Sequence, residues 1–376
     1  MKTAIITSTR ADWGLLHPLV AELTRRGEKP IIIATYAHLF PEMGDTIQEM
    51  IDDGFPPTMT VPARREPDEA VADTVTGFTK AFRFLKPDKV VILGDRFEIA
   101  GVAMAATLRG IPIVHISGGT VSQGAVDDVV RNVISQMAEY HFPETDKGRR
   151  RLILMGADPR KTVTAGALGV YNALHAPQID LQELEKYLDF ELGFRYLLGT
   201  FHPETKDVEE GEEKTGRLSS VEQMKVWIEG LGRVMEEDKE LKMLLTFPNT
   251  DTDPTPLISR LYTFQTSWPG RVKVVPSLGR VRYINAARYA AAVAGNSSSG
   301  IVEIPSVGTP VVNVGNRQRG RQCSKAVIHC PLEPSKIAAA IKEALTKDAK
   351  LIAETTPNPY YRPDTPSIIS DKLLEE

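Results

Sequence analysis

The sequence predicts an α/β protein of two domains, each with a parallel sheet buried between helices. The chain has 376 residues, more than one hydrophobic core usually serves, so two domains of roughly 170 to 200 residues are expected. Short runs of β-branched apolar residues alternate with longer amphipathic stretches, which is typical of β-α-β units. This alternation restarts after the polar, acidic stretch 177–194, so we expect a domain boundary near residue 170.

In the first half, apolar runs predict strands, and apolar residues at three- and four-residue steps predict helices. The expected strands are Thr3–Thr7, Ile31–Ala34, Lys89–Leu93, Ile111–His115, Tyr140–Phe142 and Thr162–Ala165. The expected helices are Leu15–Arg26, Asp68–Leu85, Phe97–Leu108, Asp127–Ala138 and Thr145–Met155.

The second half repeats this pattern. The expected strands are Tyr196–Gly199, Lys242–Thr246, Val272–Val275, Ala291–Ala294 and Thr309–Val312. The expected helices are Val221–Met235, Pro256–Thr266, Val281–Tyr289, Gly300–Ser306 and Pro334–Leu345. The charged stretch Asp207–Arg217 is expected to be an exposed loop or the approach to a helix.

The C-terminal segment predicts a return to the first domain. Four prolines in 355–376 precede a short amphipathic stretch, Ser367–Leu374, which suits a crossing segment followed by a docking helix. We therefore assign residues 1–170 and 356–376 to the first domain and residues 171–355 to the second.

Composition and charge narrow the classes of partner. The net charge is −4, which argues against nucleic acid or an anionic membrane as the main partner but allows a small anionic ligand. The N-terminus lacks the features of a signal peptide, and no apolar run approaches about 18 residues, so we expect a cytoplasmic protein. Cys323 and Cys330 fit neither a C-x-x-C pair nor a zinc site and are expected to be reduced thiols.

The turn after the first expected strand has the composition of an anion site. It reads T-S-T-R-A-D-W-G over Thr7–Gly14, with Arg10 leading into a helix. A helix N-terminus exposes backbone N–H groups, and Arg10 can add bidentate contacts to a phosphate. The alternative is a capped strand-helix turn with a solvated arginine.

Two further turns in the first half carry carboxylates and arginines. G-D-R-F-E, Gly94–Glu98, places Asp95 and Arg96 at the end of a strand, where ligands of open parallel sheets bind. The alternative is a simple N-cap aspartate. The long loop of His115–Asn132 leads to a helix opened by Asp127 and Asp128, with Arg131 one turn later; one carboxylate can act as acid or base, or both can merely stabilise the helix N-terminus.

The second half contains a serine-rich helix start. G-N-S-S-S-G-I-V-E, Gly295–Glu303, offers backbone and hydroxyl donors that can cradle a diphosphate, and Glu303 can accept hydrogen bonds from a ribose. G-N-R-Q-R-G-R, Gly315–Arg321, adds arginines. His202 in F-H-P-E-T follows a strand and can face a phosphate, although a lone histidine is more often structural. A serine-rich linker is the alternative for the first motif.

The sequence lacks the motifs of three common classes of active site. The sequence contains no H-E-x-x-H, no Walker A loop and no G-x-S-x-G, so metal, nucleoside triphosphatase and serine hydrolase sites are not indicated.

Taken together, these turns resemble the hydrolysing UDP-N-acetylglucosamine 2-epimerase family, in particular its branch that opens sialic and legionaminic acid synthesis. The shared motifs span nearly the whole chain in family order. They are T-R-A-D-W-G, G-D-R-F-E, V-D-D-x-x-R, F-H-P-E-T, P-N-T-D, G-N-S-S-S-G-I-x-E and G-x-R-Q-x-G-R.

The resemblance implies a GT-B architecture, in which two Rossmann-like doubly wound domains bind a nucleotide-linked sugar in the cleft between them. It implies diphosphate contacts from Arg10, His202, Ser297, Ser298 and Arg317. It implies that Glu303 binds the ribose and that Asn249 lines the nucleotide site. The sugar would be surrounded by Asp95, Arg96, Asp127 and Arg131.

The resemblance also implies a reaction. Anti elimination of the nucleoside diphosphate across C1 and C2 gives a 2-acetamidoglucal, and syn addition of water releases free N-acetylmannosamine; no cofactor is consumed. Removal of the C2 proton needs a positioned carboxylate, so Asp95 and Asp127 are the candidates, with Arg131 beside them. Arg10, His202 and Arg317 are the candidates for stabilising the leaving group. A homo-oligomer, dimer or tetramer, is expected.

Three positions depart from the family pattern. Ser117 and Thr120 stand in a loop where relatives commonly carry an acidic or histidine side chain, and Asn132 replaces a usual histidine. A GT-B glycosyltransferase and a non-catalytic nucleotide-sugar sensor therefore remain as alternatives to the epimerase. The sequence does not distinguish UDP from GDP, nor the 4-amino or 6-deoxy substituents of the sugar.

Overall fold

The computed structural model describes residues 1–40, 46–121, 126–193, 195–204, 218–248 and 254–375. Internal contacts divide these residues into two units. The N-terminal unit comprises the described residues of 1–121, 125–172 and 360–376, and the C-terminal unit comprises those of 173–359. The stretch Asp207–Arg217, expected to be an exposed loop or helix approach, lies outside the described residues.

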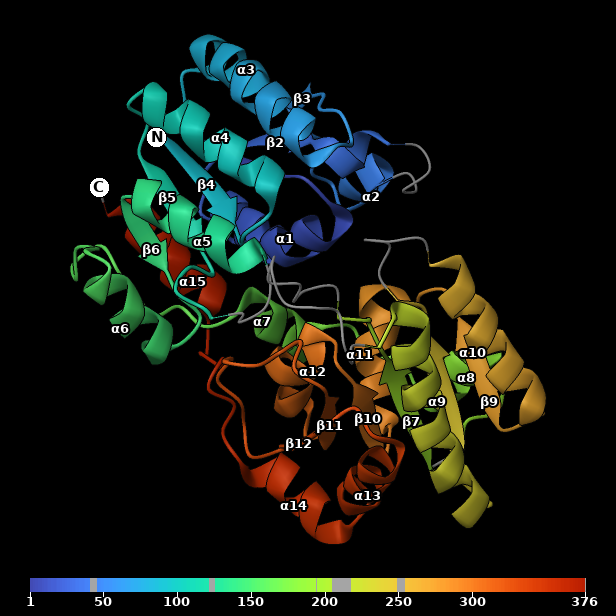
Figure 1. The fold of residues 1–376 in the computed structure, drawn as a ribbon. Helices are drawn as coiled ribbons and strands as arrows, with labels where there is room; N and C mark the ends of the chain where they lie inside the picture. The colour runs from blue at the N-terminus through green and yellow to red at the C-terminus, as the bar shows by residue number, and fades with distance from the viewer. Residues whose placement is uncertain (41–45, 122–125, 194, 205–217, 249–253, 376) are drawn as a thin grey trace, which may run out of the picture. The chain divides into compact units, whose positions relative to one another are not determined.

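The N-terminal unit is built on a six-stranded parallel sheet in the order β3-β2-β1-β4-β5-β6 (Figure 1). Its strands are β1 Thr3–Thr7, β2 Ile31–Thr35, β3 Met59–Val61, β4 Lys89–Leu93, β5 Ile113–Ile116 and β6 Tyr140–Phe142. β1 and β4 lie at the centre of the sheet, and the later strands are added outward on both sides of them, as in doubly wound folds. Turns that follow β1, β4, β5 and β6 therefore meet at one edge of the sheet.

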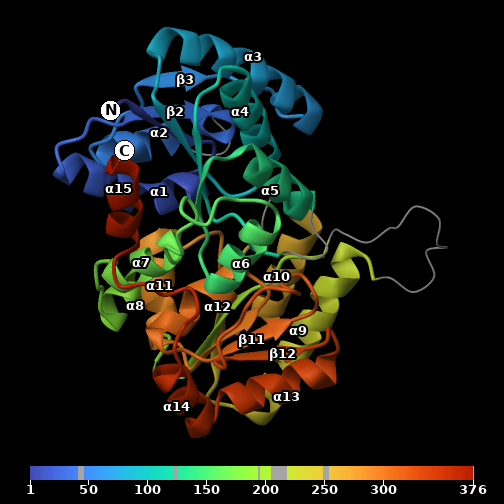
Figure 2. The same cartoon turned by 90° about the vertical axis from the view of Figure 1, so that its left-hand side faces the viewer.

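Helices cover both faces of this sheet (Figure 2). They are α1 Arg10–Arg25, η1 Tyr36–Leu39, α2 Thr46–Asp52, α3 Pro67–Leu85, α4 Phe97–Leu108, α5 Val126–Met137, α6 Asp146–Leu154 and α15 Thr365–Leu374, and the unit ends within α7 Leu168–His175. Successive strand residues point to opposite faces. Ile5 packs into a core with Trp13 of α1, and Ile6 packs into a second core with Phe78 of α3.

The C-terminal helix α15 belongs to the N-terminal unit. Its Ile369 and Leu373 are buried in the core that includes Leu19 of α1. The Ser367 hydroxyl donates to Glu22 Oε1 at 3.1 Å. The last residues of the chain thus complete the face of the sheet that α1 covers.

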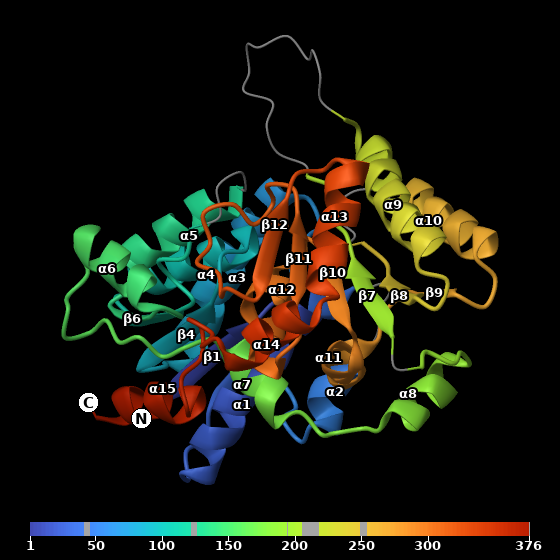
Figure 3. The same ribbon diagram turned by 90° about the horizontal axis from the view of Figure 1, so that it is seen from below.

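The C-terminal unit repeats the plan with a six-stranded parallel sheet in the order β12-β11-β10-β7-β8-β9 (Figure 3). Its strands are β7 Tyr196–Thr200, β8 Lys242–Thr246, β9 Val272–Val275, β10 Ala292–Gly295, β11 Val311–Val314 and β12 Val327–Cys330. Its helices are α8 Leu181–Leu188, α9 Ser220–Glu237, α10 Thr255–Ser267, α11 Gly279–Tyr289, α12 Ser298–Val302, η3 Ile304–Val307, α13 Pro334–Ala344 and α14 Lys347–Thr355. Trp227 of α9 and Ile337 of α13 pack with strand residue Leu245 in its largest core.

The expected strand Thr162–Ala165 is wrong. This segment runs beside β6 and forms one isolated bridge, from Thr162 to His141. The Val163 N–H donates to His141 O, and the Ala165 N–H donates to Pro143 O. Pro143 has no N–H to return a bond, so the ladder does not continue.

The pattern also missed short elements and misplaced some ends. β3, M-T-V, and β12, V-I-H-C, are edge strands of three and four residues that were not expected. The helices α2, α7, α8 and α14 were not expected either. α1 begins at Arg10 because Thr9 caps it. The expected helix Gly300–Ser306 is broken into α12 and η3, since Pro305 has no N–H to continue an α-helix.

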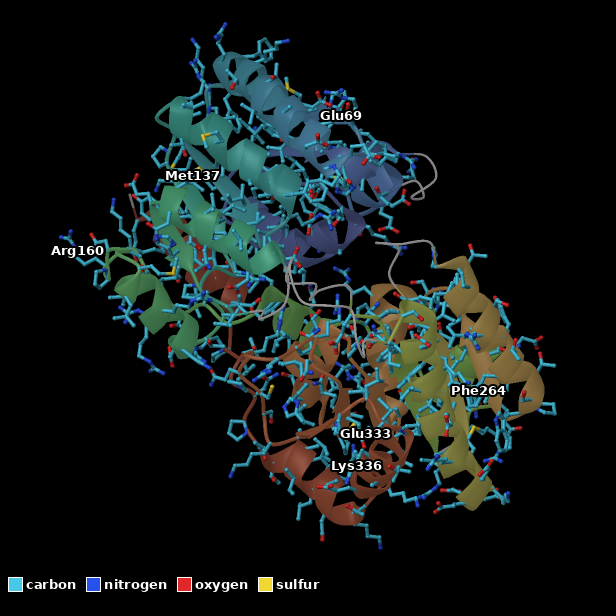
Figure 4. All side chains as sticks on the ribbon, in the orientation of Figure 1. Glu69, Met137, Arg160, Phe264, Glu333 and Lys336 are labelled. Atoms are coloured by element: carbon cyan, nitrogen blue, oxygen red, sulfur yellow. The ribbon has the colours of Figure 1, made fainter. Side chains whose placement is uncertain are left out.

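Figure 4 labels three exposed polar side chains, Arg160 in the turn after α6 and Glu333 and Lys336 at the start of α13. Among the described helices, none combines the length and the apolar character that crossing a bilayer requires.

Candidate functional site

The turn after β1 joins a capped helix start to an exposed arginine. Thr9 accepts a hydrogen bond from the Asp12 N–H at 3.2 Å, and the Ser8 hydroxyl donates to Asp12 Oδ2 at 2.7 Å. Arg10 opens α1 and pairs with Glu49 of α2 at 2.8 Å, with 53% of its side chain exposed. An exposed ion pair of this kind contributes little free energy, so an anionic ligand can compete with Glu49 for the Arg10 guanidinium.

A buried histidine that sequence reasoning missed lies beside this turn. His38 Nε2 is 2.9 Å from Thr7 Oγ1, and its Nδ1 is 2.8 Å from Thr46 Oγ1. Burial lowers the pKa of His38 to about 4, so the ring is neutral at pH 7. It therefore supports the end of β1 as an uncharged hydrogen-bonding group.

The turn after β4 presents an arginine held at its Nε. Gly94 has a φ of +78°, which favours glycine, and the chain then enters α4 with Arg96 rather than Asp95 at the N-cap position. Arg96 Nε donates to Glu98 Oε1 at 2.5 Å. The Arg96 guanidinium lies 5.7 Å from the ring centre of Tyr36. Its two terminal nitrogens are further donors that a ligand can use.

Glu98 is a buried carboxylate of the same motif. Its side chain is 0% exposed, and its Oε2 has no hydrogen-bond partner among the described residues. The G-D-R-F-E spelling located this residue, but not its burial. Its contact with Arg96 makes it a support for that guanidinium.

Asp95 and Arg131 are brought together from two different elements. Arg131 of α5 donates from Nη2 to Asp95 Oδ2, and its side chain is only 3% exposed. Arg131 Nη1 also donates to Thr120 O at 2.8 Å and to Asp128 Oδ1 at 3.2 Å. Arg131 therefore fixes the turns after β4 and β5 relative to α5.

A second arginine, which sequence reasoning missed, joins this network. Arg151 of α6 donates to Thr120 O at 3.0 Å and to Asp128 Oδ2 at 3.4 Å. Asp128 thus faces the network, while its neighbour Asp127 is exposed on α5. Helical geometry turns adjacent side chains about 100° apart, and the D-D pair alone could not tell which of the two faces inward.

The departures from the family pattern lie in this same region. The Ser117 hydroxyl donates to Glu144 Oε1 at 2.9 Å. Asn132 Nδ2 donates to Asp128 Oδ2 at 3.4 Å, and its Oδ1 has no partner among the described residues. His115 at the end of β5 is buried, and burial lowers its pKa to about 4.

The turn after β10 in the C-terminal unit is organised around Asn296. Asn296 Oδ1 accepts from the His202 N–H at 2.7 Å, and Asn296 Nδ2 donates to His202 O at 2.7 Å. Gln318 Nε2 donates to Asn296 O at 2.9 Å, and Arg317 Nη1 lies 3.4 Å from the same oxygen. One buried asparagine therefore connects His202, Arg317 and the serine-rich motif.

Ser297 and its neighbours begin α12. Ser297 is the N-cap, and its hydroxyl oxygen lies 3.0 Å from Ser299 Oγ, which contacts Tyr283 Oη at 2.8 Å. Ser298 is exposed in the first helical position, and Glu303 is half-buried at the other end of this short helix. The hydroxyl of Ser298 is therefore open to a ligand.

A cavity of about 600 Å³ lies beside the Gly315–Arg321 motif. Glu204, which sequence reasoning did not single out, lines it and accepts from the backbone N–H groups of Asn316 and Arg317 at 2.6 and 3.1 Å. Other polar side chains that line it are Gln223, Asn313, Asn316, Gln318, Arg319, Arg321 and His329. Asn249 lies outside the described residues.

Comparison with known proteins places the chain in a family. The model of the UDP-N-acetylglucosamine 2-epimerase family matches residues 21–374. The chain belongs to the UDP-N-acetylglucosamine 2-epimerase family. The resemblance predicted from the sequence motifs is confirmed.

Relatives of this family member include hydrolysing enzymes. A GDP/UDP-N,N'-diacetylbacillosamine 2-epimerase (hydrolyzing) of Campylobacter jejuni is 32% identical over 87% of this chain and 83% of the relative. A UDP-N,N'-diacetylbacillosamine 2-epimerase (hydrolyzing) of Legionella pneumophila is 30% identical over 92% of this chain and 89% of the relative. This UDP-N-acetylglucosamine 2-epimerase family member is an enzyme of the hydrolysing 2-epimerase type.

Solved structures show the same fold. The UDP-GlcNAc 2-epimerase of Neisseria meningitidis, solved with UDP-GlcNAc bound, has a TM-score of 0.76 at 16% identity and covers 100% of both chains. Two parallel six-stranded sheets flanked by helices thus confirm the predicted GT-B type of fold for this epimerase-family chain.

Proposed function

We propose that this enzyme converts UDP-N-acetylglucosamine, or a close GDP-linked, 4-amino or 6-deoxy relative, to the free sugar epimerised at C2 and a nucleoside diphosphate. The observation that carries the proposal is the Asp95–Arg131 pair, with Arg96, at the carboxyl edge of the N-terminal sheet of a chain in this family. Open parallel sheets bind ligands at this edge. The names of the two hydrolysing relatives support the substrate class.

The C-terminal unit is proposed to hold the nucleotide diphosphate. Ser297, Ser298 and Arg317 are assigned to the diphosphate, and the Asn296 connections to His202 and Arg317 support a single preorganised anion site. His202 is assigned to the same group. Glu303 is assigned to the ribose, and Asn249 to the nucleotide site.

The N-terminal unit is proposed to hold the sugar. Asp95, Arg96, Asp127 and Arg131 are assigned to it, and Arg10 is assigned to the diphosphate from this side. The two units would then share one ligand, which makes domain closure part of the reaction. The unit assignments 1–170 with 356–376 and 171–355, and a homo-oligomeric state, are parts of the same proposal.

The chemistry follows from the charges at the two sites. A carboxylate takes the C2 proton, and the electrons of the C2–H bond form the C1–C2 double bond. The C1–O bond breaks, and its electron pair leaves with the diphosphate. Arg10, His202 and Arg317 stabilise the charge of this leaving group. Water then adds across the C1–C2 double bond to release the free sugar. The elimination is proposed to be anti and the hydration syn.

Proton NMR in heavy water with a panel of UDP- and GDP-linked 2-acetamido sugars tests this function. We expect release of nucleoside diphosphate together with a free sugar that is inverted at C2 and carries deuterium there. Intact nucleotide sugars after long incubation would exclude the reaction. Transfer of the sugar to an added acceptor, without turnover in water alone, would instead identify a GT-B glycosyltransferase.

A further inference from the structure

A serine–glutamate pair lies at the carboxyl ends of β5 and β6. The Ser117 hydroxyl donates to Glu144 Oε1 at 2.9 Å, and both residues are half-buried. β5 and β6 are paired in parallel, and β5 also pairs with β4, whose following turn carries Asp95. The pair therefore lies at the same sheet edge as the Asp95–Arg131 ion pair.

Packing holds both members of this pair in place. Ser117 has a φ of +67°, and its N–H donates to the last carbonyl of β6 at 3.0 Å. Thr145 caps α6 by accepting from the Gly148 N–H at 3.1 Å, which fixes the turn that carries Glu144. A Cβ on Gly119 would lie 2.4 Å from Gly148 O, so the loop after β5 is packed directly on α6.

Two other carboxylates at this edge, Asp95 and Asp128, are paired with arginines, whereas Asp127 is exposed on α5 and stays a candidate for the base of the elimination step. Asp95 accepts from Arg131, and Asp128 accepts from both Arg131 and Arg151. Within the part of the chain that the structure describes, no lysine, arginine or histidine forms an ion pair with Glu144. A guanidinium favours the ionised carboxylate, whereas a hydroxyl serves both forms, because it can donate to the carboxylate and accept from the acid.

The proposed reaction needs two groups that carry protons. Epimerisation requires the C2 proton to leave from one face of the sugar and a proton to arrive on the other. A carboxylate fixed on one face cannot perform both transfers. Residues 117–120 read S-G-G-T, so the loop after β5 has no titratable side chain of its own.

We infer that Glu144 is the second proton carrier of this site, on the sugar face opposite the base of the elimination step, and that Ser117 positions it. This inference rests on the proposed function. It assigns a role to a residue in the turn after β6, while the hydroxyl that orients it comes from the turn after β5.

The hydration step balances through one carboxyl group. Glu144 in its acid form gives its proton to C2, and the π electrons of the C1–C2 double bond form the new C–H bond. A lone pair of water forms the bond to C1, and the Glu144 carboxylate takes the proton that this water releases. Hydrogen and hydroxyl add to the same face, and Glu144 ends protonated as it began. The proton removed from C2 in the first step passes from its base to solvent.

A purely structural role makes different predictions. Glu144 directly precedes the N-cap of α6, where a carboxylate stabilises the helix end through its charge. Loss of that effect alone would lower stability and leave the products of the reaction unchanged.

Glu144→Gln tests the inference. Glutamine keeps the shape of glutamate, but its amide cannot give a proton to the sugar and then take one from water. Product analysis by proton NMR should show nucleoside diphosphate release within about tenfold of the unmodified enzyme, with formation of the free epimer reduced about 10²- to 10⁴-fold. The unsaturated sugar should accumulate. Glu139→Gln, at the other end of β6 and paired with Lys161, is the matched control and should leave the products unchanged.

Two further variants separate chemistry from folding. Formate added to Glu144→Ala should restore formation of the free epimer, which a structural role would not allow. Ser117→Ala should slow the hydration step about threefold to tenfold, with the same accumulation of the unsaturated sugar.

The negative results of these experiments exclude different proposals. Wild-type rates of epimer formation in Glu144→Gln would overturn the inference and leave the proposed function standing. A folded Glu144→Gln protein that has lost nucleoside diphosphate release would also overturn it, because the defect would then lie in the elimination. Absence of any nucleoside diphosphate release by the unmodified enzyme would overturn both. If the Glu144 variants do not fold, unchanged products and rates in Ser117→Ala would decide against the inference.

Discussion

Arg131 is the residue on which the N-terminal site most depends. It is almost completely buried, and its guanidinium contacts Asp95, Asp128 and the carbonyl of Thr120. A charge removed from water to this extent is tolerated only because carboxylates and a carbonyl satisfy it. The turns after β4 and β5 are therefore held by one side chain of α5.

Arg131→Ala should lower the free energy of unfolding by about 3–5 kcal/mol, because two carboxylates lose their buried partner. Arg160→Ala is the control, since Arg160 is 88% exposed and surface ion pairs such as its pair with Asp158 contribute little to stability. Urea unfolding followed by circular dichroism measures both. Equal losses in the two variants would contradict the role assigned to Arg131.

Buried histidines give the protein a defined response to acid. Burial lowers the pKa values of His38, His115 and His141 to about 4, whereas a histidine in the unfolded chain takes up its proton near pH 6.5. Between about pH 6.5 and 4 the unfolded chain binds more protons than the folded one. The free energy of unfolding should therefore fall as the pH falls through this window, by up to about 3 kcal/mol per histidine.

Unfolding titrations at pH 7 and pH 5 check this response. His115→Asn should reduce the difference between the two pH values, because asparagine does not titrate. A protein equally stable at both pH values would show that these rings are protonated in the folded state.

At the scale of elements, the turns that follow the strands carry the site, and their backbones are built for close approach. Gly295 at the end of β10 has a φ of +156°, and a Cβ there would lie 1.9 Å from Thr200 O. This contact is between the backbones of two neighbouring strands, so an added methyl group could be accommodated only by moving a strand. Asn296 and Ser297 owe their positions to that approach.

Gly295→Ala should destabilise the protein more than Gly27→Ala does. Gly27 has a φ of +89° but open space around it, so its substitution costs only the backbone strain of about 1–2 kcal/mol. Thermal unfolding compares the two variants. An equal shift in Tm would mean that the β10 turn relaxes around the added methyl group.

The C-terminal helix α15 is an element of the N-terminal core. Leu373 is 1% exposed and packs with residues of α1 and the sheet. Leu373→Ala should cost about 2–5 kcal/mol of unfolding free energy, the usual range for emptying such a site. Leu154→Ala, at an 88% exposed position, should change it by less than about 0.5 kcal/mol. Denaturant titration distinguishes these outcomes, and a stable Leu373→Ala protein would show that α15 is dispensable.

At the scale of the whole molecule, the proposed function requires the two units to share one ligand. Arg10 of the N-terminal unit and Ser297 of the C-terminal unit are both assigned to the diphosphate. If they contact the same group, each of the two should contribute to the affinity for a nucleoside diphosphate alone, without any sugar attached.

Arg10→Ala and Ser297→Ala should each raise the Kd for UDP or GDP, by about 10-fold or more for the charged contact and about 3- to 10-fold for the hydroxyl. Isothermal titration calorimetry measures both, with Arg160→Ala as a charge-matched control. An unchanged Kd in Arg10→Ala would remove the N-terminal unit from the diphosphate site and leave the C-terminal assignments intact.

The sequence determined the fold class of this protein, most of its elements and its family. Buried strands such as Lys89–Leu93 are short apolar runs, and amphipathic helices such as Pro67–Leu85 carry their period within a few residues, so local pattern suffices to find them. The edge strands β3 and β12 and the irregular path of Thr162–Ala165 were not predicted, because pairing with a neighbour decides them. The motifs located Asp95, Ser297 and Arg317 because each comes soon after a strand end, and they located Arg131 within the helix that follows the loop after β5.

Only the tertiary structure decided which of these residues meet. Arg131 bonds to Asp95 across 36 positions, Asn296 connects to His202 across 94, and Arg151 and Glu144 gain their partners only where β5, β6 and α6 pack together. Hydrogen bonds and ion pairs act over about 3–4 Å in space and leave no period in the chain. A strand or helix is specified by its neighbours in sequence, whereas this site is specified by the order of strands in two sheets.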